Sequence, residues 1–160
     1  MARGRYIEDF NVGDQFPTAR RTVTETDLVL FTGLSGDFNP LHTDEIYAQG
    51  TPHETRILHG LLGMAIASGL VGQTGLCTGT ALGFLGMTWK YTGSIKPGDT
   101  IHVMQTVTEA RKSSKPGQGV LKRQIDIINQ HGKIVQTGEW VVLVMTRDHP
   151  SAIAEREAAR

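Results

Sequence analysis

An acid and an imidazole lie five positions apart in the segment SGDFNPLH, which runs from Ser35 to His42. A carboxylate such as Asp37 and a histidine such as His42 can act on one water molecule and exchange its protons, as additions and eliminations require. Asn39 precedes a proline and is therefore biased away from helical geometry, so an upstream helix should end near Gly36 or Asp37. The turn that follows can bring Asp37 and His42 to the same side.

Spacing alone leaves two other interpretations open. Asp37 could merely satisfy free amides at a helix end, and His42 could be a solvated turn residue. A metal-binding or structural module could instead use the imidazoles and carboxylate of His42, Asp44, His53 and His59, although these spacings lack the short paired pattern of a strong zinc motif.

The elements that must position this segment carry helix signals. Thr24 and Asp27 are spaced as in a capping box, which predicts a helix over residues 25–36. Thr43 offers an N-cap for a second, short helix over residues 44–49. The segment of interest should therefore connect two helices.

Further along the chain, the pattern changes from helix to strand. Residues 59–74 are apolar on every side, which predicts a core helix that is buried all round. Alternating and β-branched residues then predict antiparallel strands separated by turn sequences. With one more strand at the start of the chain, the expected fold is α+β, a curved sheet wrapped around a single helix. The strands are expected within residues 15–23, 80–91, 99–110, 119–128 and 133–146.

Four glycines, Gly60, Gly63, Gly69 and Gly72, fall in the predicted core helix. Each would cost about 1 kcal/mol relative to alanine in an exposed helix, so a compensating reason is expected. Close packing against the sheet is the expected reason for the later three glycines. At Gly60 we expect a ligand to approach the start of the helix.

Composition narrows the class of protein. Sixteen basic and sixteen acidic residues give a formal net charge of zero, which argues against a general nucleic-acid or anionic-membrane surface. Cys77 is the single cysteine and excludes an intramolecular disulfide framework. The N-terminus has no apolar core of signal-peptide length, and the most apolar run of the chain is too short to span a bilayer. We therefore expect a soluble, cytoplasmic protein. One domain over residues 1–150 and a polar tail over residues 151–160 are expected.

The segment from Phe31 to His42, followed by Ala48, resembles the signature of the MaoC-like, (R)-specific enoyl-CoA hydratase family. Leu58-His59-Gly60 is similar to a second segment that opens the central helix in that family. The resemblance covers most of the chain. It implies a hot-dog fold, in which an antiparallel sheet wraps a long central helix, assembled at least as a homodimer.

The resemblance also implies roles for three residues. Asp37 and His42 fall on the family's acid–base pair, which would activate the water added to C3 of a trans-2-enoyl thioester. Gly60 matches the position whose backbone amide would donate to the thioester oxygen. The start of a helix suits this role because it presents free N–H groups and a favourable dipole to negative charge.

Supporting roles are expected for three further residues. Asn39 is similar to a supporting residue of the family's site. Ser68 matches a polar residue of the family's helix, where it would hydrogen-bond either a catalytic side chain or its own backbone. His59 could fix the helix start or hydrogen-bond within the site, but a buried structural histidine is the favoured interpretation.

The reaction implied is that of a hydro-lyase, the reversible hydration of an enoyl-CoA to a (3R)-hydroxyacyl-CoA. This chemistry requires no metal or redox cofactor, and coenzyme A enters as part of the acyl-CoA substrate. Its phosphates need basic residues, but the available lysines and arginines are more typical of ordinary solvated charges. These candidates are Lys90, Lys96, Arg111, Lys112 and Lys115.

A hot-dog acyl-CoA thioesterase is the main alternative function. Such an enzyme commonly needs a carboxylate on or near the central helix, and the sequence has no Asp or Glu between Glu54 and Asp99. The absence favours the hydratase. Acyl chain length and branching leave no signature that can be interpreted in the sequence.

Overall fold

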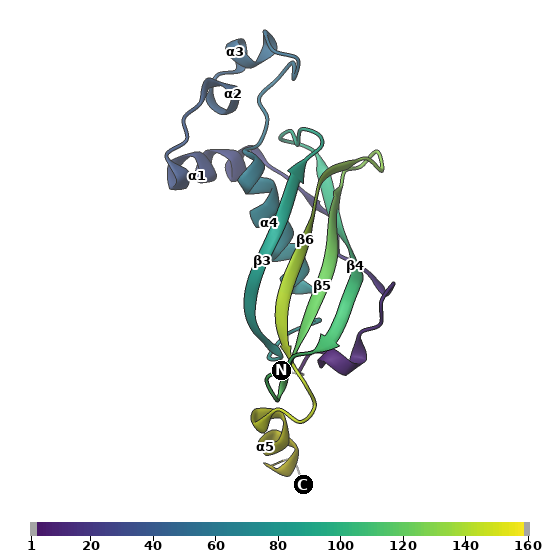
Figure 1. The fold of residues 1–160 in the computed structure, drawn as a ribbon. Coiled ribbons are helices and arrows are strands. Elements are labelled where there is room, and N and C mark those ends of the chain that lie inside the picture. Colours follow the sequence, from purple (N-terminus) through teal and green to yellow (C-terminus); the bar gives the residue numbers. More distant parts are fainter. Residues whose placement is uncertain (1–2, 159–160) are drawn as a thin grey trace.

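A long helix lies against the concave face of a curved antiparallel sheet in the computed structural model, which describes residues 3–158 (Figure 1). The helix is α4 (Gly60–Gln73). The strand order is β1-β4-β5-β6-β3, with β2 paired to β4. The four long strands are β3 (Ala81–Tyr91), β4 (Thr100–Lys112), β5 (Gln118–Ile128) and β6 (Ile134–Met145).

Alternation along the strands builds the core between the sheet and α4. Every second residue in the middle of β4 and β5 is buried, so one face of each strand points toward the helix. Ile125 and Ile127 on this face are fully buried and pack with Leu62 and Ile66 of α4. The sheet and the helix therefore share one apolar layer, which confirms the predicted α+β architecture.

The single strand predicted over residues 15–23 is wrong in detail. The chain instead forms two short strands, β1 (Gln15–Pro17) and β2 (Arg21–Thr22), and both pair with β4. Between them, the Thr18 hydroxyl accepts the backbone N–H of Val103 at 2.9 Å. A side chain thus replaces a carbonyl of the sheet ladder and interrupts the strand.

Three helices form the end of the molecule that carries the SGDFNPLH segment (Figure 1). They are α1 (Glu25–Ser35), α2 (Pro40–Thr43) and α3 (Glu45–Gln49). The predicted capping box is confirmed, since Thr24 accepts the Asp27 N–H and the Asp27 side chain accepts the Thr24 N–H. Gly36 ends α1 with φ of 72°.

The predicted N-cap of the short helix is wrong by one residue. Asp44, not Thr43, caps α3 by accepting the N–H of Tyr47. Thr43 is the last residue of α2, where its hydroxyl donates to the carbonyls of Phe38 and Asn39. Because Thr43 belongs to the helical turn that begins at Pro40, its hydroxyl is bonded within that turn and does not cap α3.

Helix α4 is buried on one side only, so the expectation of burial all round is wrong for the single chain. Leu61 is 56% exposed, while Leu62 is 6% exposed. Close packing explains Gly63, where a Cβ would overlap the side chains of Gln136 and Ile95. It does not explain Gly69 or Gly72, because a Cβ on either would meet no atom within 4 Å.

The C-terminal residues form a short helix beyond the sheet. Helix α5 (Pro150–Ala158) covers the described part of the predicted tail, and Ala152 is fully buried. A 3-10 turn, η1 (Ile7–Asp9), packs near the N-terminus. Within residues 3–158, no helix has the length and apolar character needed to cross a membrane.

Candidate active site

The fold gathers Asp37, His42 and His59 at one point beside the start of α4. One oxygen of the carboxylate and one nitrogen of each imidazole all lie within 4.8 Å of one another. Asp37 follows the left-handed turn at Gly36, His42 belongs to α2, and His59 is the N-cap of α4. The predicted Asp37 and His42 are therefore neighbours in space, and His59 joins them.

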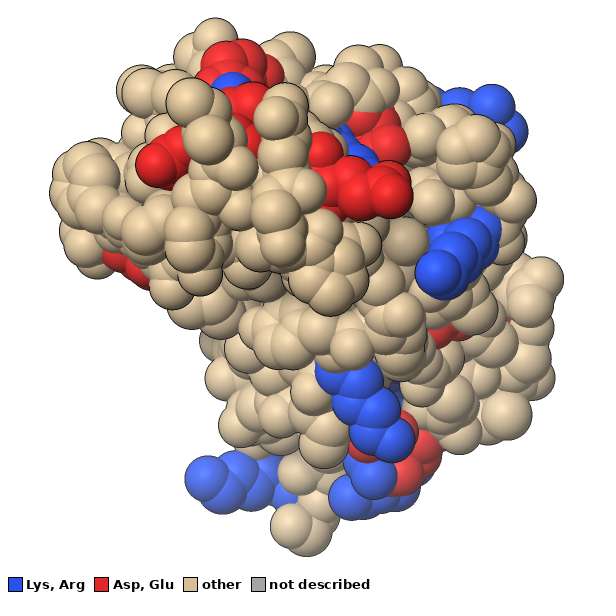
Figure 2. Space-filling model, turned by 90° about the horizontal axis from the view of Figure 1, so that it is seen from above, with Lys and Arg blue, Asp and Glu red and all other residues tan. Residues whose placement is uncertain are grey.

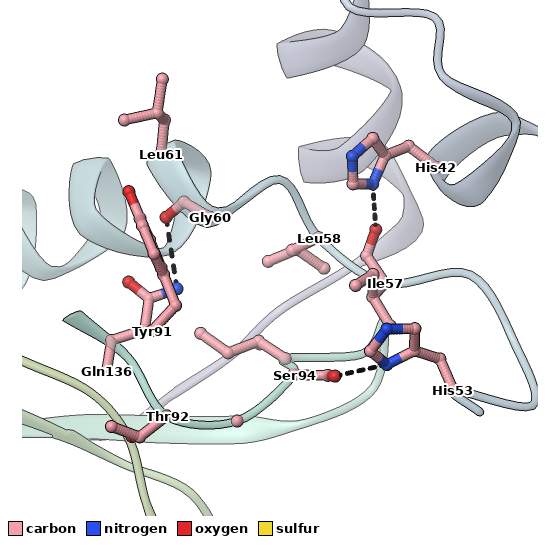
Figure 3. Close-up of a pocket in the computed structure, with 12 residues that line it drawn as sticks. His42, His53, Ile57, Leu58, Gly60, Leu61, Tyr91, Thr92, Ser94 and Gln136 are labelled. Atoms are coloured by element: carbon pink, nitrogen blue, oxygen red, sulfur yellow. Dashed lines mark hydrogen bonds between the residues drawn. The ribbon is translucent and has the colours of Figure 1, made fainter. Parts of the chain in front are cut away.

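His42 is held in one tautomer by the backbone. Its Nδ1 lies 2.8 Å from the carbonyl oxygen of Ile57, and a carbonyl can only accept a hydrogen bond (Figure 3). Nδ1 therefore carries a proton, so in the neutral ring the lone pair is on Nε2. The second nitrogen of His42 is thus suited to accept a proton.

His59 is buried, at 4% exposure, between α1 and α2. Its Nε2 donates to the backbone carbonyl of Asp37 at 2.9 Å and lies 3.9 Å from the Asp37 carboxylate. The ring stacks on His42, with centroids 3.8 Å apart and an angle of 28° between the planes. Its Nδ1 is buried without a partner among the described residues. These contacts fix both Asp37 and the His42 ring.

Asp37 and Asn39 also make the local hydrogen bonds of the turn. One Asp37 carboxylate oxygen accepts the backbone N–H of Asn39 at 3.2 Å, and the side chain is 54% exposed. The Asn39 side chain accepts the N–H of Leu41 and caps α2. Asn39 therefore supports the site by shaping the turn before His42.

An ion-pair network holds the segment that supplies the His42 partner. Arg56 donates to Glu25 at 2.7 Å and to Glu45 at 3.2 Å, so it joins α1 to α3 immediately before Ile57. Hydrogen bonds from the Thr55 hydroxyl and from Arg56 lower the pKa of Glu45. The same acidic partners raise the pKa of Arg56. This network positions the carbonyl that fixes the His42 tautomer.

A cavity of about 570 Å³ opens beside this cluster, at the start of α4 (Figure 3). His42 and Gly60 are in its wall, and His59 stacks on His42 from outside the wall. The Asp37 carboxylate is not in the wall but lies within 4.8 Å of a ring nitrogen of His42. The volume is in the range of small-molecule sites. The wall comprises His42, His53, Ile57, Leu58, Gly60, Leu61, Tyr91, Thr92, Gly93, Ser94, Ile95 and Gln136.

The first turn of α4 provides backbone donors in this wall. The first intrahelical hydrogen bonds are made by Leu62 and Gly63 to the His59 carbonyl, so the N–H groups of Gly60 and Leu61 precede them. Tyr91 lies against Gly60, where a Cβ would fall 2.5 Å from its ring. The Gly60 carbonyl accepts from Gln136 at 3.2 Å, and Gln136 in turn accepts from the Trp89 indole at 3.1 Å.

Ser68 lies away from this cluster. It lines a separate cavity of about 240 Å³ farther along α4, together with Met64, Phe84 and Trp140. Among the described contacts, none joins Ser68 to Asp37 or His42. The structure therefore brings together Asp37, His42, His59 and Gly60, with Asn39 at the turn, and leaves Ser68 apart.

Sequence reasoning predicted only His42 and Gly60 among the residues of the cavity wall. Tyr91 ends β3, Ser94 lies in the loop that follows, and Gln136 faces inward from β6. His53 was considered only as a metal ligand, and its Nδ1 shares a hydrogen bond with the Ser94 hydroxyl at 2.7 Å. A glutamine at an inward strand position was the one local signal, because β-strand alternation would place an apolar residue there.

The four residues of the metal alternative are not gathered. Asp44 caps α3 and His53 bonds Ser94, so only His42 and His59 lie together. The three potential ligands that the structure places close to one another are Asp37, His42 and His59. Both imidazoles already donate one N–H to a backbone carbonyl.

Acidic residues gather around the end formed by α1, α2 and α3 (Figure 2). Residues 25–56 contain six carboxylates and one basic residue, Arg56. A few blue atoms lie among these carboxylates in this view, in keeping with the ion pairs of Arg56 with Glu25 and of Arg21 with Asp27, and most other Lys and Arg side chains lie below them. The negative field of the helical end would repel a polyanion, so an anionic ligand would meet its cations on other elements.

The central helix and its curved sheet define the hot-dog class of proteins. A conserved hypothetical protein from Mycobacterium tuberculosis described as a double hot-dog fold superposes with a TM-score of 0.71 at 17% identity, covering 89% of this chain and 44% of that one. At that identity the likeness shows the fold alone.

The MaoC like domain model matches residues 9–126. An (R)-specific enoyl-CoA hydratase from Rhodospirillum rubrum is 34% identical over 142 residues, covering 89% of this chain and 93% of the relative. The crystal structure of a MaoC-like dehydratase from the same organism superposes with a TM-score of 0.80 at 31% identity, covering 90% of this chain and 99% of that one. The chain belongs to the MaoC-like family of hydratases and dehydratases.

Proposed function

We propose that this protein is an (R)-specific enoyl-CoA hydratase, which adds water reversibly to a trans-2-enoyl-CoA to give a (3R)-hydroxyacyl-CoA. The observation that carries the proposal is the cluster of Asp37, His42 and His59 beside a cavity at the start of α4. The relative named (R)-specific enoyl-CoA hydratase matches nearly the whole chain and supports the same reaction.

In the proposed mechanism, Asp37 and His42 hold one water molecule between them. The unprotonated Nε2 of His42 accepts a proton as the water oxygen bonds to C3 of the enoyl group. The electron pair of the double bond moves toward C2 and the thioester oxygen, and C2 then takes up a proton from the acid–base pair. Removing either group should remove most of the 10²–10⁴-fold gain typical of acid–base catalysis.

The start of α4 would stabilise the negative charge that develops on the thioester oxygen. The N–H of Gly60 is the proposed donor, because it precedes the first intrahelical bond and lies in the cavity wall. The positive end of the helix dipole adds to this effect. Gln136 donates to the Gly60 carbonyl, which belongs to the next peptide, between Gly60 and Leu61, and so holds the chain on the other side of the Gly60 Cα.

The substrate is proposed to be an acyl-CoA, with coenzyme A as part of the substrate and no further cofactor. The acidic end formed by α1 to α3 disfavours the phosphates of coenzyme A, so they should lie toward the strands and loops that carry lysine and arginine. Residues in the wall of the cavity set the length of acyl chain that fits.

We also propose that the protein works as a homodimer. Strand β3 pairs only with β6 among the described strands, so its other edge is unpaired. Leu82, Phe84, Leu85 and Met87 on this strand are each at least 40% exposed. An unpaired edge with exposed apolar side chains is an association surface that soluble proteins normally cover.

The test is stereospecific hydration of crotonyl-CoA by the purified protein, followed as loss of the conjugated enoyl thioester. Asp37→Asn and His42→Ala should each lower kcat by at least about a hundredfold with folding intact. His131→Ala, on the exposed β5–β6 turn, is the matched control and should retain full activity. The wild-type product should be the (R) alcohol.

Two results would contradict the proposal. Release of free CoA thiol without hydration would indicate a thioesterase. Hydration that survives in both Asp37→Asn and His42→Ala would show that another group activates the water.

A further inference from the structure

A guanidinium lies inside the protein at the end of α4 that is opposite Gly60. Arg123 faces inward from β5 and is 4% exposed. Its Nη1 donates to the side-chain oxygen of Gln105 at 2.6 Å, while its Nε is buried without a partner among the described residues. None of the ion pairs of the described residues includes Arg123. Within residues 3–158, the one side chain that accepts a hydrogen bond from this guanidinium is therefore an uncharged amide.

No carboxylate of the described residues balances the charge. Burial lowers the pKa of Arg123, which reflects the cost of keeping a guanidinium away from water. The neighbouring titratable group is Cys77, and burial raises the pKa of its thiol, so the sulfur is neutral at pH 7. The carboxyl end of α4 favours a cation, but the carbonyls of Val71 and Gly72 already accept from Thr74 and Gly75.

The unpaired guanidinium lines a cavity of its own, of about 280 Å³. Val71, Leu76 and Ala81 supply apolar walls, and Cys77 and Thr78 supply a thiol and a hydroxyl. Val71 lies eleven residues after Gly60 on the same helix, about 16 Å away at the rise of an α-helix. The two cavities share no lining residue.

We propose that this cavity is a binding site for a small monocarboxylic acid, whose carboxylate pairs with Arg123 and whose short apolar chain lies on Val71, Leu76 and Ala81. A guanidinium and a carboxylate match in shape and charge, so the carboxylate would supply the counter-charge that Arg123 lacks among the described residues. A phosphate dianion fits less well, because the cavity offers one cation and lies at the negative end of a helix. The site is independent of the proposed hydratase activity.

The experiment measures the melting temperature in a zwitterionic buffer, with sodium butyrate, sodium chloride or sodium phosphate added at matched ionic strength and a reductant present. Butyrate should raise the wild-type melting temperature with saturation, because a ligand that binds only the folded state stabilises it. Arg123→Met should weaken this response at least tenfold, as expected for loss of a charged hydrogen bond. Arg20→Met, at an exposed position, should respond as wild type does.

A second measurement does not depend on a variant that folds. Cys77 lines the cavity, so bound butyrate should slow alkylation of its thiol by iodoacetamide, whereas uncharged methyl butyrate should not. Equal melting responses to butyrate, chloride and phosphate would overturn the proposal in favour of a general salt effect. So would an unchanged response in Arg123→Met, or equal protection of Cys77 by the acid and its ester.

Discussion

The two stacked imidazoles of the candidate site have different surroundings, from which we infer different roles for His42 and His59. His42 lines the cavity and gives its Nδ1 proton to a fixed carbonyl, which leaves Nε2 for a ligand. His59 is buried behind it and holds the Asp37 backbone. We infer that His42 exchanges protons with the substrate, while His59 positions the other two residues.

At Gly60 the geometry makes a specific prediction about activity. Gly60→Ala would place a methyl group 2.5 Å from the Tyr91 ring, so either the ring or the first turn of α4 must move. If the Gly60 amide stabilises the reaction and this shift moves it out of reach of the thioester oxygen, kcat for crotonyl-CoA hydration should fall by about 10²-fold, the usual effect of losing one such donor. Steady-state kinetics of the folded variant measure this.

Because alanine keeps the backbone N–H, the double variant Gly60→Ala/Tyr91→Ala tests whether crowding against Tyr91 is what displaces the donor. Removing the ring opens space for the new methyl group, so the double variant should recover most of the activity of Tyr91→Ala alone. If it stays as slow as Gly60→Ala, the glycine is needed for a reason other than its contact with Tyr91.

The residues of the site differ in how far the sequence predicted them. Asp37 and His42 flank one short turn, so local chain geometry allowed them to meet, and the resemblance to the family favoured that arrangement over the alternatives. Gln136 and Ser94 reach the cavity through long-range strand pairing and a loop, which local pattern does not encode. His59 was predicted as a residue of the site, but its stacking on His42 depends on how α4 docks against α2.

At the scale of elements, local signals predicted helix α1 and missed features that depend on neighbours. The capping box at Thr24 and the end of α1 at Gly36 are both set by residues within one turn. The break between β1 and β2 depends on Thr18 meeting Val103, which lies 85 residues away. Register between distant strands is therefore the information that the sequence pattern lacked.

The network that joins α1 to α3 should make the stability of this end depend on pH. The folded-state pKa of Glu45 is lowered below its ordinary value of 4.5, so its charged form stabilises the folded protein. That contribution is fully present above about pH 4.5 and is lost as pH falls through the lower folded pKa. Glu45→Gln should therefore lower the melting temperature at pH 7 and leave it unchanged at the lowest pH where the protein stays folded.

Thermal melts of the wild type and Glu45→Gln across pH 3 to 7 test this prediction. Glu54→Gln serves as the control, because no hydrogen bond from that side chain is part of the network around Arg56. A difference between Glu45→Gln and wild type that is the same at every pH would show that the ionisation of Glu45 plays no part.

At the scale of the whole molecule, the helix and the sheet together leave one apolar face uncovered. Leu61 and Ala65 on α4 are exposed, and so are the large apolar side chains of β3 at the edge of the sheet. The prediction of a helix buried all round fails in the single chain for this reason. A second copy placed along the β3 edge would cover both surfaces at once, which is why we expect a homodimer.

Leu85→Glu tests this arrangement. Leu85 is 54% exposed on β3, and a carboxylate buried against a second copy would be costly, so the variant should raise the dimer dissociation constant at least tenfold. Val12→Glu is the matched control, because Val12 is 69% exposed away from β3. Sedimentation velocity should give about twice 17.4 kDa for the wild type and Val12→Glu, and 17.4 kDa for dilute Leu85→Glu.

Hydration assays on the same three proteins connect assembly to the site. The start of α4, with exposed Leu61 in the cavity wall, borders the face that a second copy would cover. If that copy completes the wall, the activity of Leu85→Glu should fall as the protein is diluted, in parallel with dissociation. A wild type that sediments as a monomer at every concentration, or a monomeric variant with full activity, would mean that the single chain holds the whole site.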